Sequence, residues 1–453
     1  MKFFPFPAAA ALTAAVTAVP LLSLSAANAP AAETKARAAT AAAAPATAPT
    51  PTPISSAWIS SLTAGALKIH PQAEASRART LAARRALDAL PLWQDTMTGI
   101  GFMAADRSMR RDDGDVTLSV EQPLPRLGLY RAGKNRVIAE ASMQQAEEGA
   151  TANEIGLAIA RMVTDLALTD EIIRLQSAEV GWMRTLVGTA QERSKNPDST
   201  AVEVLRLESG LAILTQNQDT LVRQRGQLVQ SLNLILLKPA RTFWPQTALP
   251  VQAAGTPLSA DALRTEMERR NPKLLALRQA VEAAGADVET ARQQGRPSVS
   301  VGVEANAWSG GDLRSSMFML KFSLPWLNRK SLQAETARRG ELQQAAQKDL
   351  EAGRLELATL LTEFLTVAEN QSRLAASYQT EVIPRAEKSL QALENAWISS
   401  QSTLPEVLEA QRLLLGARQS QKRATAAWFA ALQQLAALSG AFTPSSSFPS
   451  LRP

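Results

Sequence analysis

Cysteine is absent from this chain of 453 residues, and histidine occurs once, as His70. Without cysteine there can be no disulfide, no thiolate metal site, no cysteine nucleophile and no acylated N-terminal cysteine. One histidine without cysteine partners does not make a transition-metal site of the ordinary type, so we expect no bound metal and no other cofactor. His70 precedes Pro71, where we expect it to have a structural role.

Aromatic residues and excess charge are also scarce. Aromatic side chains make up 5% of the residues, and the formal net charge is +6. Lys and Arg are interleaved with Asp and Glu, which is typical of solvated helix faces and argues against a nucleic-acid partner. The sequence shows no His-based triad, no recognisable pair of catalytic acids and no phosphate-binding loop, so we expect that the protein is not an enzyme.

Long apolar runs are confined to the beginning of the chain. Lys2, the apolar residues 8–22 and the small residues up to Ala29 form the pattern of a secretory signal peptide, which we assign to residues 1–29. Residues 30–53 are rich in Ala, Pro and Thr and predict a disordered leader. No later run reaches about eighteen apolar residues, so no transmembrane helix is expected. Residues 441–453 predict a disordered tail.

Two stretches alternate between apolar and polar residues. Residues 298–324 alternate on both sides of a turn signal at residues 309–312 and end before Pro325, and residues 96–122 repeat the pattern around a charged loop. Each stretch predicts two β-strands with one apolar and one polar face. The polar face of the later pair carries Glu304 and Lys321.

Strands of about ten residues with this alternation fit a transmembrane β-barrel, with Glu304 and Lys321 facing the lumen. Four strands cannot close a barrel, and an open sheet edge is not tolerated in lipid, so several chains would have to share one barrel. The alternative is two ordinary hairpins on a soluble protein, with Glu304 and Lys321 as a hairpin pair. Methionines near the strands fill space or, alternatively, hold soft copper ions: Met97, Met103, Met109, Met317 and Met319.

The apolar period becomes helical after each strand pair. Seam residues recur in steps of four and three from Ile155 to Val187 and again from Ala346 to Tyr378, which predicts coiled-coil helices. The junctions at Pro125 and Pro325 lie 200 residues apart, so the chain contains two repeats. We assign them to residues 54–239 and 258–440, joined by a connector at residues 240–257. Each repeat predicts a helix, a strand pair, a very long helix, a tight turn and a returning helix.

Two such units behind a signal peptide resemble the TolC family of outer-membrane efflux proteins. The segment Phe-Ser-Leu-Pro-Trp-Leu-Asn-Arg at residues 322–329 looks like the family's strand-to-helix junction and is similar to the CzcC- and CusC-like heavy-metal branch. Residues 402–412 look like the family's second periplasmic tip. The resemblance implies a mainly α fold with a small β part. Long coiled-coil helices form an α-helical barrel, and a trimer shares one β-barrel with four strands from each chain.

The resemblance also implies a function. The protein would be a passive trimeric duct in the outer membrane of a Gram-negative bacterium, with a long periplasmic extension. Its partners would be outer-membrane lipid, a periplasmic adaptor protein and an inner-membrane pump of the RND type, and its substrates heavy-metal cations. The competing class is a secreted structural or adhesive coiled coil, which would share the seams but not the duplicated strand pairs.

A gate at the second tip is implied as well. Glu406 and Glu409 match acidic positions that line the narrow periplasmic end in the family, and three chains would give two carboxylate rings that favour cations. Trp397 stands where relatives often have an aromatic residue that braces the closed tip, and Ser402 stands where some have Arg. The alternative for the two glutamates is a solvated first-turn pair that interacts favourably with the helix dipole.

Overall fold

The computed structural model describes residues 51–102, 115–195, 201–251, 259–308, 311, 313–399 and 401–443. The predicted signal peptide at 1–29 lies outside these ranges, as do residues 30–50 of the predicted leader and residues 444–453 of the predicted tail. The turn signal at residues 309–312 is described only at Gly311. Within the described part, no helix is both long and apolar enough to cross a membrane.

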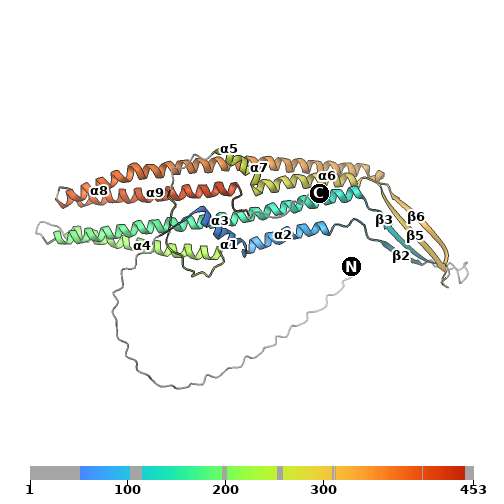
Figure 1. The fold of residues 1–453 in the computed structure, drawn as a ribbon, viewed down its shortest axis with the longest axis horizontal. Coiled ribbons are helices and arrows are strands. Elements are labelled where there is room, and N and C mark those ends of the chain that lie inside the picture. Colours follow the sequence, from blue (N-terminus) through green and yellow to red (C-terminus); the bar gives the residue numbers. More distant parts are fainter. Residues whose placement is uncertain are drawn as a thin grey trace, which may run out of the picture. The chain divides into compact units, whose positions relative to one another are not determined.

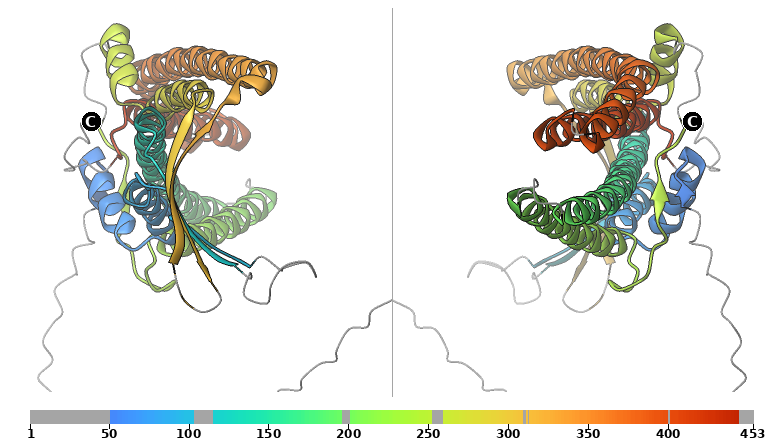
Figure 2. Two further views of the ribbon diagram at one scale, coloured as in Figure 1. Left: turned by 90° about the vertical axis from the view of Figure 1, so that its right-hand side faces the viewer. Right: turned by 90° about the vertical axis from the view of Figure 1, so that its left-hand side faces the viewer.

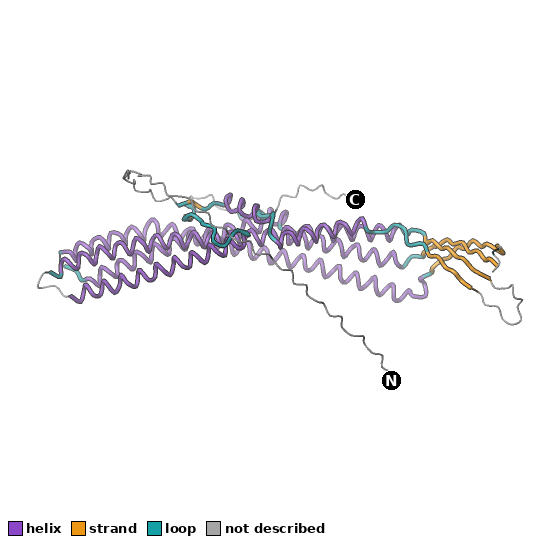
Figure 3. Tube along the Cα trace, turned by 90° about the horizontal axis from the view of Figure 1, so that it is seen from below, coloured by secondary structure: helices purple, strands orange, loops and turns teal. Residues whose placement is uncertain are grey.

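The two predicted strand pairs form a single sheet. Its strands are β2 (Met97–Phe102), β3 (Asp115–Pro123), β5 (Ser298–Trp308) and β6 (Leu313–Ser323). They pair antiparallel in the order β2-β3-β5-β6, so β3 of the first repeat hydrogen-bonds to β5 of the second. The sheet lies at one end of the helices (Figures 1 and 3). The alternative of two separate hairpins therefore does not describe this chain.

The helices follow the predicted repeat. The first repeat contains α1 (Ser56–Leu67), α2 (Pro71–Asp88), α3 (Leu127–Arg193) and α4 (Ala201–Ile235). The second contains α5 (Ala260–Arg270), α6 (Pro272–Gln294), the 3-10 turn η1 (Pro325–Asn328), α7 (Arg329–Ser377), the π-turn η2 (Tyr378–Val382), α8 (Ile383–Ile398) and α9 (Leu404–Leu438). They form a curved layer, with α1 and α5 on its convex side (Figure 2).

Both repeats break their first helix in the same way. His70 Nδ1 accepts a hydrogen bond from the Gln72 N–H at 3.3 Å, and Asn271 Oδ1 accepts one from the Leu274 N–H at 3.2 Å. Each is the N-cap residue of a helix whose first residue is proline, which needs no hydrogen-bond partner for a backbone N–H. The only histidine of the sequence thus caps a helix.

The second seam departs from its predicted course. Beyond Leu357 the buried positions of α7 are Leu361, Leu365, Ala368 and Ala375, while Leu374 is 44% exposed. Two successive steps of four, from Leu357 to Leu361 and on to Leu365, turn the buried side by about 80° around a straight helix, so it leaves the predicted positions. The π-turn η2 was not predicted either. It comes directly before Pro384, which cannot donate a backbone hydrogen bond and disturbs the helical ladder.

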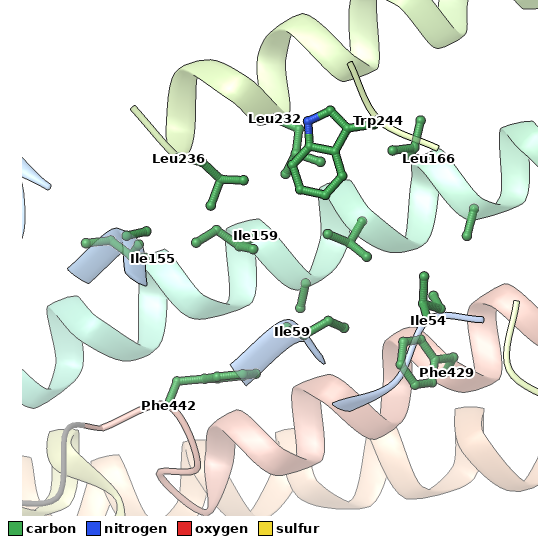
Figure 4. Close-up of a cluster of buried hydrophobic side chains, with 14 of the residues drawn as sticks. Ile54, Ile59, Ile155, Ile159, Leu166, Leu232, Leu236, Trp244, Phe429 and Phe442 are labelled. Atoms are coloured by element: carbon green, nitrogen blue, oxygen red, sulfur yellow. The ribbon is translucent and has the colours of Figure 1, made fainter. Parts of the chain in front are cut away.

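A hydrophobic cluster around the middle of α3 joins both repeats. Short strands β1 (Thr52–Pro53) and β4 (Thr247–Ala248) pair in parallel beside it. Figure 4 shows large side chains from five segments meeting there: Ile54, Ile59, Ile155, Ile159, Leu166, Leu232, Leu236, Trp244, Phe429 and Phe442. Burial of these side chains binds the connector between the repeats to α3.

A buried ion pair fastens the same connector. The Asp170 carboxylate of α3 accepts a hydrogen bond from Arg225 of α4, and its Oδ2 accepts from the backbone N–H and the hydroxyl of Thr247, both at 2.8 Å. Arg225 also donates to the Pro245 carbonyl at 3.1 Å. The side chain of Asp170 is 4% exposed, so its charge depends on these partners for compensation.

Replacing Asp170 with Ala should release the connector. The change leaves the Arg225 guanidinium and the Thr247 N–H without their carboxylate. Removing one partner of a buried pair lowers the free energy of unfolding by roughly 3 kcal/mol. We expect faster trypsin cleavage after Arg241 in the folded protein, whereas the Lys238–Pro239 bond resists trypsin. The exposed Asp219 of α4 provides the matched control, because Asp219→Ala removes an acidic group without a buried partner. Equal cleavage rates in the two variants would contradict this role of Asp170.

Candidate functional site

The sheet has one apolar and one polar face, as its register shows. Residues that lie directly opposite each other share a face, so Ile100, Leu118, Ala305 and their neighbours form the apolar face. Its large side chains are exposed: Ile100, Phe102, Leu118, Val120, Val303, Phe318, Leu320 and Phe322. Phe102 is 79% and Phe318 71% exposed. An apolar face of this extent is costly in water and requires a partner or lipid.

The polar face carries a charged group near the helices. Glu121 of β3 accepts a hydrogen bond from Ser300 at 2.6 Å and forms an ion pair with Lys321 at 2.5 Å. Lys321 is thus paired across β5 with a residue of the first repeat. Glu304 lies opposite Ser119 and Met317, four residue pairs along β5 from the Ser300–Lys321 pair, so Glu304 and Lys321 do not form the hairpin pair considered above. Sequence reasoning missed Glu121, because its partner depends on the register between distant strands.

Small residues and methionines fill the rest of the polar face. Gly99 lies across from Ser119, where a Cβ atom on residue 99 would come within 2.6 Å of the serine Oγ. Met97, Met317 and Met319 lie on the same face by register. Met103 and Met109 lie outside the described residues.

The second tip is built around Trp397. This side chain at the end of α8 is 2% exposed. Arg193, at the end of α3, lies over the indole ring at 4.6 Å from its centre and donates a hydrogen bond to the Trp397 carbonyl at 2.8 Å. A guanidinium stacked on a ring and bonded to the same residue's backbone holds α8 against α3. Arg193 was not singled out from the sequence.

Ser402, Glu406 and Glu409 lie on the far side of the tip turn. Ser402 Oγ donates to the Leu393 carbonyl at 3.1 Å and so closes the turn. Glu406 is exposed, and its carboxylate accepts the Thr403 N–H at 2.9 Å, which is one half of a capping box. Glu409 is also exposed and lies 3.7 Å from Arg412, a surface pair of small energy. In the single chain both carboxylates are solvated, Glu406 in the first turn of α9 and Glu409 in the second, so they are not the first-turn pair considered above.

Two further polar contacts join α3 to the second hairpin. Trp182 Nε1 donates to Glu394 of α8 at 2.6 Å, and Gln411 of α9 donates to Glu179 of α3. Burial raises the pKa of Glu179, which the Gln411 hydrogen bond and Arg418 oppose. The Gln411 Oε1 is buried and accepts no hydrogen bond. These contacts lie along a cleft of about 260 Å³ between α3, α8 and α9.

The described residues contain no group of three or more His, Asp or Glu side chains arranged to hold a metal ion. The acids of the tip are spread along the helices rather than gathered around one point.

Residues 263–441 match the family model described as "Outer membrane efflux protein". The chain is 23% identical over 379 residues to the pyoverdine export outer membrane protein OpmQ of Pseudomonas putida, with 78% of each chain covered. Among solved structures, the outer-membrane channel OprN superposes with a TM-score of 0.72 at 16% identity, covering 85% of this chain and 91% of that one. CusC gives a TM-score of 0.70 at 16% identity, covering 85% and 93%.

These similarities confirm the predicted fold class, and the matches are to channels rather than to enzymes. OprN and CusC superpose almost equally well, so the fold does not separate a heavy-metal branch from other channels. The chain therefore has the fold of TolC-like outer-membrane channels, and its second repeat matches the model of the outer membrane efflux proteins.

Proposed function

We propose that this protein is the outer-membrane component of a tripartite efflux system. It acts as a passive duct of three chains that leads substrates from a periplasmic adaptor and an inner-membrane RND-type pump to the outside. The single observation that carries the proposal is the four-stranded sheet with an exposed apolar face and unpaired edges at β2 and β6 in the described chain. A soluble adhesive coiled coil does not require a sheet with an exposed apolar face and open edges.

Three copies of the sheet would close a barrel of twelve strands, with β6 of one chain pairing with β2 of the next. The apolar face then meets lipid, and the polar face lines the lumen with Glu304, Lys321 and Glu121. The Glu121–Lys321 pair would recur three times around the helix-side end of the lumen. Because each pair is internally neutral, Glu304 near the middle of β5 adds a separate negative charge to the lumen among the described residues.

The gate would lie at the second tip. Arg193 and Trp397 keep the end of α8 on α3, and Trp182–Glu394 and Glu179–Gln411 extend that attachment away from the tip. Arg193 thus supplies from the first hairpin the guanidinium that some relatives place at the Ser402 position. With the hairpins held in this way, Glu406 and Glu409 of three chains would ring the narrow end.

Two substrate classes are supported by separate observations. The junction at residues 322–329 favours heavy-metal cations, as in the branch that it resembles. The relative OpmQ is named for the export of pyoverdine, which favours an organic metal chelator. Both classes pass through a wide duct, so selection between them belongs to the pump.

The particle in detergent should contain three chains. Four strands leave two sheet edges open, and only shared closure pairs them. Native mass spectrometry of the full chain measures the number directly. A monomer that keeps its β-signal in circular dichroism and inserts into bilayers would contradict the shared barrel.

Removing the charges at positions 406 and 409 should change the conductance of the gate. The double variant Glu406→Gln, Glu409→Gln keeps the capping hydrogen bond, since Gln serves the same capping position as Glu, but abolishes the carboxylate rings. In planar bilayers it should lose block by divalent cations added on the periplasmic side and show weaker cation preference.

The matched control for this gate is Glu203→Gln, a half-buried acid in the first turn of α4 at the other tip, which should conduct and block like the parent. If the double variant behaves like this control, the two glutamates serve only the helix end and the gate lies elsewhere.

Glu179→Gln should strengthen the attachment between the hairpins. The new amide can still accept the hydrogen bond from Gln411 and can also donate one to the unsatisfied Gln411 Oε1. The added hydrogen bond should raise the free energy of unfolding by roughly 1 kcal/mol. The pKa of Glu179 in the folded protein is raised above its ordinary value of 4.5, so the folded state holds the proton more tightly than the unfolded state. The parent protein therefore loses stability as the pH rises from 4.5 through the folded pKa. The variant should therefore melt at a higher temperature than the parent at pH 7, with the difference shrinking toward pH 4. A pH-independent difference would contradict the raised pKa.

A further inference from the structure

A basic pocket lies where α2, α3 and α6 meet beside Thr443. Its volume is about 520 Å³, within the usual range for sites of small organic ligands. Three of its lining side chains are arginines, and a single carboxylate faces them: Arg77, Arg84, Arg270 and Glu148. None of these residues belongs to the sheet or to the tip.

Contacts within the protein hold the arginines at the rim. Arg77 donates to the Leu67 carbonyl at 2.8 Å and lies 3.7 Å from Glu148. Arg84 donates to the Gln145 side chain at 3.0 Å, and Arg270 pairs with Glu266 at 2.7 Å. The side chains of Arg77 and Arg270 remain 39% and 60% exposed. A guanidinium has five N–H donors in a planar fork, so the contacts of Arg77 and Arg270 orient these two groups and leave donors for a ligand.

The inner wall of the pocket is apolar. Ala146, Pro272 and Leu275 line it, and the side chain of Leu81 is 59% exposed at its edge. Gly149 lets α3 come close to the start of α6, because a Cβ atom on residue 149 would lie 3.3 Å from both Pro272 and Thr443. Because Gly149 has no side chain, this part of the pocket wall is not filled.

We propose that this pocket binds a small organic anion, with one phosphate or carboxylate group on the arginines and an apolar body against Leu81 and Leu275. Arginine pairs with such groups through two parallel hydrogen bonds. The three guanidinium groups face two carboxylates, Glu148 beside Arg77 and Glu266 beside Arg270, so a surplus of one positive charge favours an anion over a cation. The apolar wall distinguishes the site from one for a bare inorganic ion.

The ligand would come from the periplasm rather than from the membrane. The pocket lies at the first turns of α6, whose 23 residues separate it from β5 by roughly 35 Å along the helix. That distance exceeds the depth of a lipid headgroup layer. The site is separate from the lumen-lining face of the sheet, so its occupancy does not depend on what the channel exports.

The test uses 1-naphthyl phosphate as a fluorescent probe on the full chain in a non-ionic detergent. Fluorescence anisotropy should show saturable binding at one site per chain, and 1-naphthol and 1-naphthylmethylamine should not displace the probe. The double variant Arg77→Gln, Arg270→Gln should bind at least tenfold more weakly. The control Arg79→Gln, Arg269→Gln changes neighbouring arginines outside the pocket and should bind within twofold of the parent.

Four results would overturn the proposal. Absence of saturable binding, or equal binding by the two double variants, would show that the arginines form no site. Displacement of the probe by inorganic phosphate at the probe's own affinity would show that the apolar wall contributes nothing. Loss of probe binding only in nanodiscs that contain phosphatidylglycerol would assign the pocket to a lipid headgroup instead of a soluble anion.

Discussion

Closure of the sheet is the constraint on which the rest of the structure depends. The strands β2, β3, β5 and β6 satisfy one another's backbone groups but leave the outer edges of β2 and β6 open in the described chain. Water would hydrate those edges but not the exposed apolar face, whereas lipid accepts the face but not the edges. The proposed barrel shared by three chains meets both demands. In that assembly the long helices that continue from the strands would form a ring of matching size.

Helix α3 carries most of the connections that such a ring needs. Along its length, Asp170 holds the connector between the repeats, Glu179 binds α9 and Arg193 binds the end of α8. The hydrophobic cluster at its middle adds side chains from both repeats. A single helix therefore aligns the first hairpin, the second hairpin and the connector, and the polar contacts fix the helical register that apolar packing alone would leave less specific.

Local patterns predicted the elements well because their causes are local. Alternation follows from the two faces of a strand, and the steps of four and three follow from the helical period, so the repeat and the fold class could be recognised. The Glu121–Lys321 and Arg193–Trp397 contacts could not, since each depends on registers between segments about 200 positions apart. The seam beyond Leu357 deviated because packing favoured steps of four over the ideal coiled-coil period. Likewise, Glu406 and Glu409 could be placed on one face but not assigned a role, because that role depends on neighbouring chains.

The π-turn at Tyr378–Val382 has a mechanical consequence. The regular ladder of α7 stops at Ser377 and resumes at Ile383, where α8 begins, so the π-turn is a joint in the hairpin that ends at the second tip. Bending stress applied at the tip would concentrate at this joint, and the part of α7 that packs against α6 would remain straight. The position of the π-turn along the chain therefore sets the length of the lever and how far the tip swings for a given bend.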